Sequence, residues 1–179
     1  VDFYSKFNIK QCSPFCRFVI NHFKSLPNTT NLIDIGCGNG RDSYELAKHF
    51  NVVGIDQSNL PDTDKNPRFE KADFTTYDFK GFHIIYRVSR SILFQSITPY
   101  ITTKYSQKLD TFIETRSDKG TTTETHYGDT HYRNLTNIKY ITELLTHYNF
   151  LIHYIKEDKG FAPFKDEDPV CIRIIATKT

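Results

Sequence analysis

Residues 32–40 read LIDIGCGNG, a short apolar run that passes directly into three alternating glycines. Apolar residues at helical spacing follow from about Arg41, so the stretch predicts a strand, a glycine turn and a helix. Glycines let the backbone approach a ligand at the carboxyl edge of a sheet, where a side chain would block it. The free N–H groups at the start of the helix favour a carboxylate or phosphate at the same place.

A second apolar run, residues 51–56, ends in Asp56, roughly 20 residues after Gly36. An acid at this spacing can accept hydrogen bonds from both hydroxyls of a ribose. The combination predicts a nucleoside-cofactor site, with a purely structural turn as the alternative. A dinucleotide fingerprint needs glycine at position 41, where Arg41 stands, and this disfavours NAD and FAD.

Working outward, short β-like runs alternate with helical ones, which predicts an α/β sheet with mostly parallel strands. A first helix is expected from Ser13 and Pro14, ending before Pro27. Residues 118–134 form a polar stretch, which we interpret as a long functional loop. Further strands are expected at 68–73, 82–86, 109–115, 150–155 and 170–176, and further helical segments at 89–108 and 136–148.

Composition limits the class of protein. The 179 residues, 38% hydrophobic and 25% charged, suffice for one domain with a core and argue against disorder. The net charge of +2 gives no footprint for nonspecific DNA binding. The sequence has no apolar run of about 18 residues, so we expect neither a membrane span nor a signal peptide. We therefore expect a cytoplasmic location. No disulfide framework or metal site is expected from the four scattered cysteines, Cys12, Cys16, Cys37 and Cys171.

The chain resembles the class I S-adenosylmethionine-dependent methyltransferases over residues 32–74. The resemblance rests on the motifs at 34–40 (DIGCGNG), 53–56 (VGID) and 72–74 (ADF). It implies a Rossmann-like, doubly wound, seven-stranded sheet, mostly parallel with an antiparallel last strand. It also implies one domain over residues 1–179, in which residues 1–30 supply a lid segment and helix and 31–179 form the core, with S-adenosyl-L-methionine as cofactor.

The same resemblance assigns the cofactor contacts. The glycine turn would accommodate the methionine portion, Asp56 the ribose hydroxyls, and Asp73 with Phe74 the adenine ring. Tyr86 and Arg87 lie where the family joins cofactor and acceptor, although a buried tyrosine closing the core is an equal alternative. The full set of predicted contacts is Tyr4, Asp34, Gly36, Cys37, Gly38, Gly40, Asp56, Gln57, Ser58, Ala72, Asp73, Phe74, Tyr86 and Arg87.

Candidate catalytic residues lie in the polar stretch. His126 and His131 are the best candidates for a general base, because histidine titrates near neutral pH and loops carry function. Tyr132 and Arg133 are candidates for orienting the acceptor, Arg133 especially if the acceptor carries phosphate or carboxylate. The alternative is that the histidines are solvated loop residues and that Tyr132 only packs the loop down.

The C-terminal half is similar to a subgroup found with polysaccharide and sugar-nucleotide genes, through residues 130–133 (THYR) and 160–173. This predicts methyl transfer to a small polar acceptor, such as a sugar or sugar-nucleotide oxygen or nitrogen. The chain departs from the family at residues 81–83, where an acid usually stands, and it lacks the signature of amino-methylating DNA enzymes after residue 86. The alternatives are a protein or RNA methyltransferase and a noncatalytic cofactor-binding scaffold subunit. Nucleic acid and membranes are not expected as partners, and the oligomeric state is open.

Overall fold

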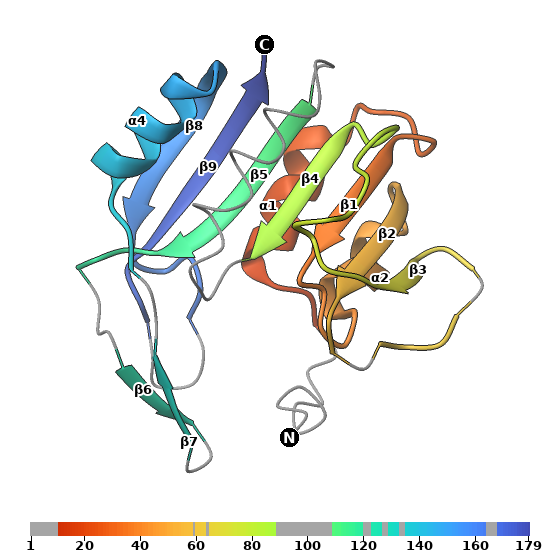
Figure 1. Ribbon diagram of the computed structural model, residues 1–179, viewed down its shortest axis with the longest axis horizontal. Helices are drawn as coiled ribbons and strands as arrows, with labels where there is room; N and C mark the ends of the chain where they lie inside the picture. Colours follow the sequence, from red (N-terminus) through yellow and green to blue (C-terminus); the bar gives the residue numbers. More distant parts are fainter. Residues whose placement is uncertain are drawn as a thin grey trace. The chain divides into compact units, whose positions relative to one another are not determined.

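The protein is described here by a computed structural model. It describes residues 11–58, 60–63, 65–88, 109–119, 123–126, 129–132, 135–163 and 168–179 of the chain. These residues form helices and strands (Figure 1) and belong to two compact units, Val1–Arg87 and Val88–Thr179. No helix in the described part of the chain is long and apolar enough to cross a membrane.

The first unit is built on four parallel strands. β1 (Asn31–Ile35) pairs with β2 (Asn51–Asp56) on one side and with β4 (Ile84–Val88) on the other, and β2 pairs with β3 (Arg68–Lys71). β1 and β2 are apolar and buried along almost their whole length, as parallel strands covered on both faces require. Parallel pairing brings the carboxyl ends of all four strands to one edge of the sheet.

Two helices accompany these strands. α1 (Pro14–Phe23) begins as predicted, because the Ser13 side chain accepts a hydrogen bond from the Cys16 N–H and Pro14 occupies the first turn. α2 (Arg41–Leu46) is short and follows the glycine turn directly. β3 ends two residues before its expected end at Asp73, because the Asp73 carboxylate accepts from the Thr75 N–H and forms a local turn instead of continuing the strand.

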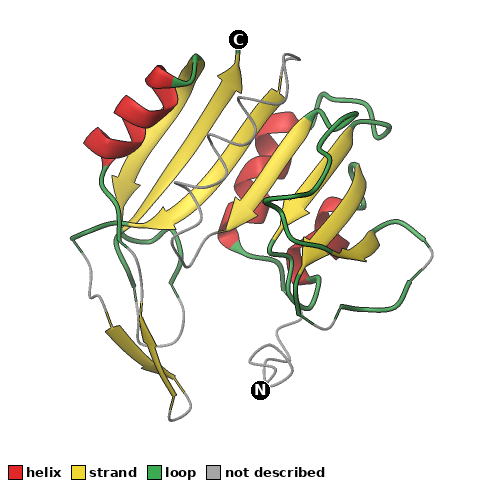
Figure 2. Cartoon of the chain, viewed as in Figure 1, coloured by secondary structure: helices red, strands yellow, loops and turns green. Residues whose placement is uncertain are grey.

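The second unit centres on β9 (Cys171–Lys178), which is buried throughout and pairs antiparallel with β5 (Leu109–Arg116) and with β8 (Phe150–Asp158). α4 (Ile138–His147) covers the predicted helical segment with its ends trimmed. Strands and helices are coloured separately in Figure 2. In the complete strand order, β3-β2-β1-β4-β5-β9-β8, the antiparallel member is β9, the last strand of the chain, so the predicted seven-stranded α/β fold is confirmed.

The prediction of a loop at 118–134 is wrong in part. Two strands, β6 (Thr123–His126) and β7 (Asp129–Tyr132), pair antiparallel within it as a separate sheet. β6 alternates threonine with Glu124 and His126, and β7 contains one threonine, Thr130. β-branched threonine favours strands, but without an apolar face the alternation gives little signal. The strand predicted at 82–86 starts and ends two residues later than expected, as β4 (Ile84–Val88). The helical segment expected at 89–108 lies outside the described residues.

A buried ion pair links β5 and β9 in the second unit. Arg173 Nε donates to Glu114 Oε2 at 2.6 Å, and their side chains are only 9% and 4% exposed. The Arg173 guanidinium also donates to the Phe161 carbonyl at 2.6 Å and lies 4.3 Å from the centre of the Phe161 ring. The same cation therefore holds both the strand register and the start of the β8–β9 connection.

We expect Arg173→Met to lower the free energy of unfolding by about 3–5 kcal/mol, because it leaves the Glu114 carboxylate buried and without its cation. Urea denaturation measures the loss. The Glu114→Gln/Arg173→Met double variant, which buries no charge, should recover most of it. Equal stability of the single and double variants would contradict this account.

Candidate functional site

The glycine turn between β1 and α2 has the backbone that glycine permits. Gly36, Gly38 and Gly40 have φ of 75°, 56° and 76°, in the left-handed region that other residues rarely adopt. The N–H groups of Gly36 and Cys37 both donate to the Ile55 carbonyl, at 2.8 and 3.2 Å, which ties the turn to β2. No described residue lies within 4 Å of a Cβ placed on Gly36, so the described residues leave this side of the turn open.

At Gly40, the third glycine of the turn, packing also requires glycine. A Cβ on Gly40 would lie 2.5 Å from the Phe69 ring, and one on Gly54 would lie 2.8 Å from the same ring. Phe69 on β3 therefore packs directly against the turn and the middle of β2. We expected the glycines to make room for a ligand, but at position 40 the room is taken by the Phe69 side chain.

Asp56 lies at the carboxyl end of β2 and contacts the turn. Its Oδ2 accepts from the Gly38 N–H at 2.9 Å, and its Oδ1 accepts from the Ser58 N–H at 2.9 Å and from Ser58 Oγ at 2.8 Å. The carboxylate is thus held in one orientation beside the turn. The structure brings together Gly38, Asp56 and Ser58 of the predicted cofactor set, and Gln57 is exposed beside them.

Asp34 is the buried acid of β1. It is 3% exposed, and Ser43 Oγ of α2 donates to its Oδ2 at 2.6 Å. Burial raises the pKa of Asp34 to about 7, because the hydrogen bond from Ser43 offsets only part of the desolvation and the Asp42 charge adds repulsion. Cys37, another residue of the predicted cofactor set, is half-buried, and burial raises the pKa of its thiol. It therefore stays a neutral thiol near neutral pH.

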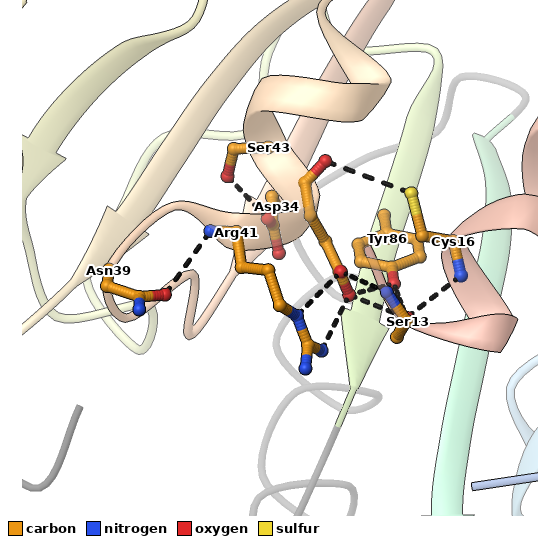
Figure 3. A network of polar contacts seen from close by, with 8 residues as sticks. Ser13, Cys16, Asp34, Asn39, Arg41, Ser43 and Tyr86 are labelled. Carbon is orange, nitrogen blue, oxygen red and sulfur yellow. Dashed lines mark hydrogen bonds and ion pairs between the residues drawn. The ribbon is translucent and has the colours of Figure 1, made fainter. Parts of the chain in front are cut away.

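Sequence reasoning missed Asp42, the centre of a buried network. Its carboxylate accepts from the Ser13 N–H, from Ser13 Oγ and from the Tyr86 hydroxyl, each at 2.7 Å. Arg41 Nε adds an ion pair at 3.0 Å. Figure 3 shows Ser13, Arg41 and Tyr86 converging from α1, α2 and β4. Burial by itself would raise the pKa of Asp42, but the Arg41 charge and these hydrogen bonds lower it below its usual value.

The network also accounts for Tyr86. The side chain is fully buried and stacks on Phe15 of α1, with ring centres 5.4 Å apart. Burial and the Asp42 charge raise the pKa of its hydroxyl well above 10. These contacts match the alternative of a tyrosine that closes the core, and a contact with the cofactor stays a prediction. No local sequence signal could have found the network, because Asp42 is 29 residues from Ser13 and 44 from Tyr86.

Beyond β3, Ala72 is half-buried, Asp73 is exposed and Phe74 is buried. Thr75 Oγ1 and its N–H both donate to Asp73 Oδ1, at 2.7 and 2.8 Å, and these bonds lower the pKa of Asp73. The Arg87 guanidinium of β4 lies 5.4 Å from the centre of the Phe74 ring. Phe74 and Arg87, predicted from separate motifs, therefore meet in the first unit.

The candidate catalytic residues are described only by backbone. The β6–β7 register pairs His126 with Asp129 and Glu124 with His131, so both histidine positions fall on one face of the hairpin. Tyr132 pairs with Thr123 and falls on the other face, apart from the two histidines. Tyr4 and Arg133 lie outside the described residues. Among the residues that were described, no three His, Cys, Asp or Glu gather closely enough to hold a metal ion.

We expect Asp34→Asn to raise the free energy of unfolding at pH 8 by about 1–3 kcal/mol. Because folding raises the pKa of Asp34, the wild type loses stability as pH rises from about 4, the value in the unfolded chain, to about 7 in the folded one. Asparagine can still accept from Ser43 and carries no charge, so it avoids that loss.

Urea denaturation at pH 5 and pH 8 measures the difference. The gap between the two pH values should shrink in Asp34→Asn and widen in Ser43→Ala, which removes the remaining hydrogen bond. An unchanged gap in Asp34→Asn would show that this carboxylate is not the source of the pH dependence.

No family model and no curated protein matches the sequence. Solved structures do. A methyltransferase from Methanosarcina mazei that depends on S-adenosylmethionine is 18% identical, with a TM-score of 0.68 over 89% of this chain and 96% of its own. The Burkholderia thailandensis 1,6-didemethyltoxoflavin-N1-methyltransferase, solved with 1,6-didemethyltoxoflavin and S-adenosylhomocysteine, is 15% identical, with a TM-score of 0.67 over 93% of this chain and 77% of its own.

The magnesium protoporphyrin IX methyltransferase of Synechocystis, solved with S-adenosylhomocysteine, is similar too. It is 13% identical, with a TM-score of 0.65 over 92% of this chain and 82% of its own. At these sequence identities, the similarity concerns the fold alone. The chain has the Rossmann-like fold of class I S-adenosylmethionine-dependent methyltransferases.

Proposed function

We propose that this chain binds S-adenosyl-L-methionine and transfers its methyl group to a small polar acceptor. The observation that carries the proposal is Asp56, whose carboxylate is held against the Gly38 N–H at the carboxyl end of β2. The open side of the turn at Gly36 supplies space next to it. A purely structural turn would need neither a charged acid beside it nor an open face.

The residues present fit the cofactor. The turn at Gly36 would receive the methionine portion, Asp56 would accept from the ribose hydroxyls, and Ser58 and Phe74 would border the adenine. Asp56 keeps its orientation through Ser58 and Gly38, so binding would require little rearrangement. The bound cofactor supplies a methyl group on a sulfonium, which a nucleophilic oxygen or nitrogen attacks in line. The chain has to align that atom and remove its proton.

For the acceptor we propose a sugar or sugar-nucleotide hydroxyl or amine, with His126 or His131 as the base that takes the proton. The support is the placement of both positions on one face of the β6–β7 hairpin. A neutral imidazole can accept a proton near neutral pH. Arg133 would orient the acceptor.

We expect Asp56→Ala to weaken binding of S-adenosylmethionine about 10–100-fold, because hydrogen bonds to a charged group contribute about 1.5–3 kcal/mol. Isothermal titration calorimetry measures the dissociation constant. Asp56→Asn, which keeps an acceptor for the Gly38 N–H, separates loss of the ligand contact from loss of the turn.

Glu143→Ala, which removes an exposed carboxylate from α4, is the matched control and should bind like the wild type. Parallel titration with NAD tests the disfavoured cofactor class. If the wild type binds NAD but not S-adenosylmethionine, or if Asp56→Ala binds S-adenosylmethionine normally, the assignment is wrong.

We expect the His126→Ala/His131→Ala double variant to lose about 10²–10⁴-fold in turnover, the usual contribution of a general base, while its cofactor affinity stays within about twofold. Release of S-adenosylhomocysteine from a panel of hexoses, amino sugars and nucleoside-diphosphate sugars gives the rate.

The control is Thr125→Ala/Thr130→Ala, a directly paired couple on the opposite face of the same hairpin. Equal turnover in the two double variants would remove the histidines from the mechanism. Cofactor binding by the wild type without turnover on any panel member would favour a noncatalytic scaffold or a macromolecular acceptor.

A further inference from the structure

Arg87 is a buried cation that lacks hydrogen-bond partners at two of its nitrogens among the described residues. Its residue is 4% exposed, and within the described part of the chain neither Nε nor Nη1 has a hydrogen-bond partner. Arginine stays charged in proteins, and a buried charge is costly unless it is paired. An unsatisfied guanidinium of this kind requires an explanation in a native fold.

The acids of the first unit that border the turn do not supply the partner. Asp34 is bonded to Ser43, and Asp42 to Arg41, Ser13 and Tyr86. Asp56 and Asp73 accept from Ser58 and Thr75. Burial lowers the pKa of Arg87 to about 10.

The position of Arg87 in the sheet puts it beside the proposed cofactor site. Asp34 pairs with Tyr86 in the β1–β4 register, so Arg87 is level with Ile35, the residue before the glycine turn. Because side chains alternate along a strand, it lies on the face of β4 opposite to Tyr86 and the Asp42 network. Its near neighbour there is Phe74, at 5.4 Å.

We infer that Arg87 binds an oxyanion, a carboxylate or a phosphate, carried by the methyl acceptor. This inference rests on the proposed function and narrows it to acidic acceptors. A guanidinium binds either group by charge-assisted hydrogen bonds, and Nε and Nη1 each offer a donor for such a bond. The other available oxyanion is the cofactor's own carboxylate. The affinity of Arg87→Met for S-adenosylhomocysteine decides between the two anions.

Inorganic phosphate and acetate serve as probes. Each is titrated calorimetrically at constant ionic strength into the protein alone and into protein saturated with S-adenosylhomocysteine. We expect the wild type to bind at least one of them at least tenfold more tightly than Arg87→Met does, with Arg87→Lys in between because it keeps the charge but has fewer, differently placed donors. Arg68→Met removes an exposed arginine at the amino end of β3, the opposite edge, and should bind like the wild type.

Thermal unfolding checks the fold of the variants. Because Nε and Nη1 bind nothing among the described residues, Arg87→Met should not lower the unfolding midpoint. The inference is overturned if the wild type binds neither probe, or if Arg87→Met binds both as the wild type does. It is also overturned if Arg87→Met loses tenfold or more in affinity for S-adenosylhomocysteine, since the guanidinium would then hold the cofactor.

The same titrations separate this inference from the proposed function. Phosphate or acetate binding that depends on Arg87, in a wild type that does not bind S-adenosylhomocysteine, would leave the anion site standing and remove the cofactor. Normal binding of S-adenosylhomocysteine without any anion binding would support the cofactor and overturn the anion site.

Discussion

The first unit depends on one buried carboxylate. Asp42 receives hydrogen bonds from Ser13 just before α1, from Tyr86 in the middle of β4 and from its own neighbour Arg41. A buried charge is tolerated only when donors surround it, and here they lower the pKa of Asp42 although burial opposes this. Since α2 begins immediately after the glycine turn, the network that holds Asp42 also fixes where that turn ends.

The turn itself is restrained from two directions. Its N–H groups donate to β2 through the Ile55 carbonyl and the Asp56 carboxylate, and Phe69 packs against Gly40 from β3. The described residues leave the side at Gly36 open. A loop that binds a ligand with little rearrangement has to be held in this way, because ordering it during binding would reduce affinity.

Three buried ionisable groups in this unit differ in how far their partners offset the cost of burial. Asp42 is fully paired and remains ionised. Asp34 has one donor, and burial raises its pKa to about 7. The guanidinium of Arg87 has two nitrogens without partners among the described residues, although it lies next to the turn. Uncompensated charge at the ligand edge of a sheet is unfavourable for folding alone, and it becomes favourable when a ligand of opposite charge binds.

The sequence by itself determined the order of strands and helices, because apolar periodicity and the glycine run at 36–40 are local signals. It also located Asp56, whose spacing from the turn follows from the length of one helix and one strand. It missed the β6–β7 hairpin, whose sequence has no apolar alternation, and it missed Asp42, whose partners are 29 and 44 residues away. Only the tertiary structure decided which buried charges are paired, because pairing depends on which strands and helices become neighbours, and no local pattern records that.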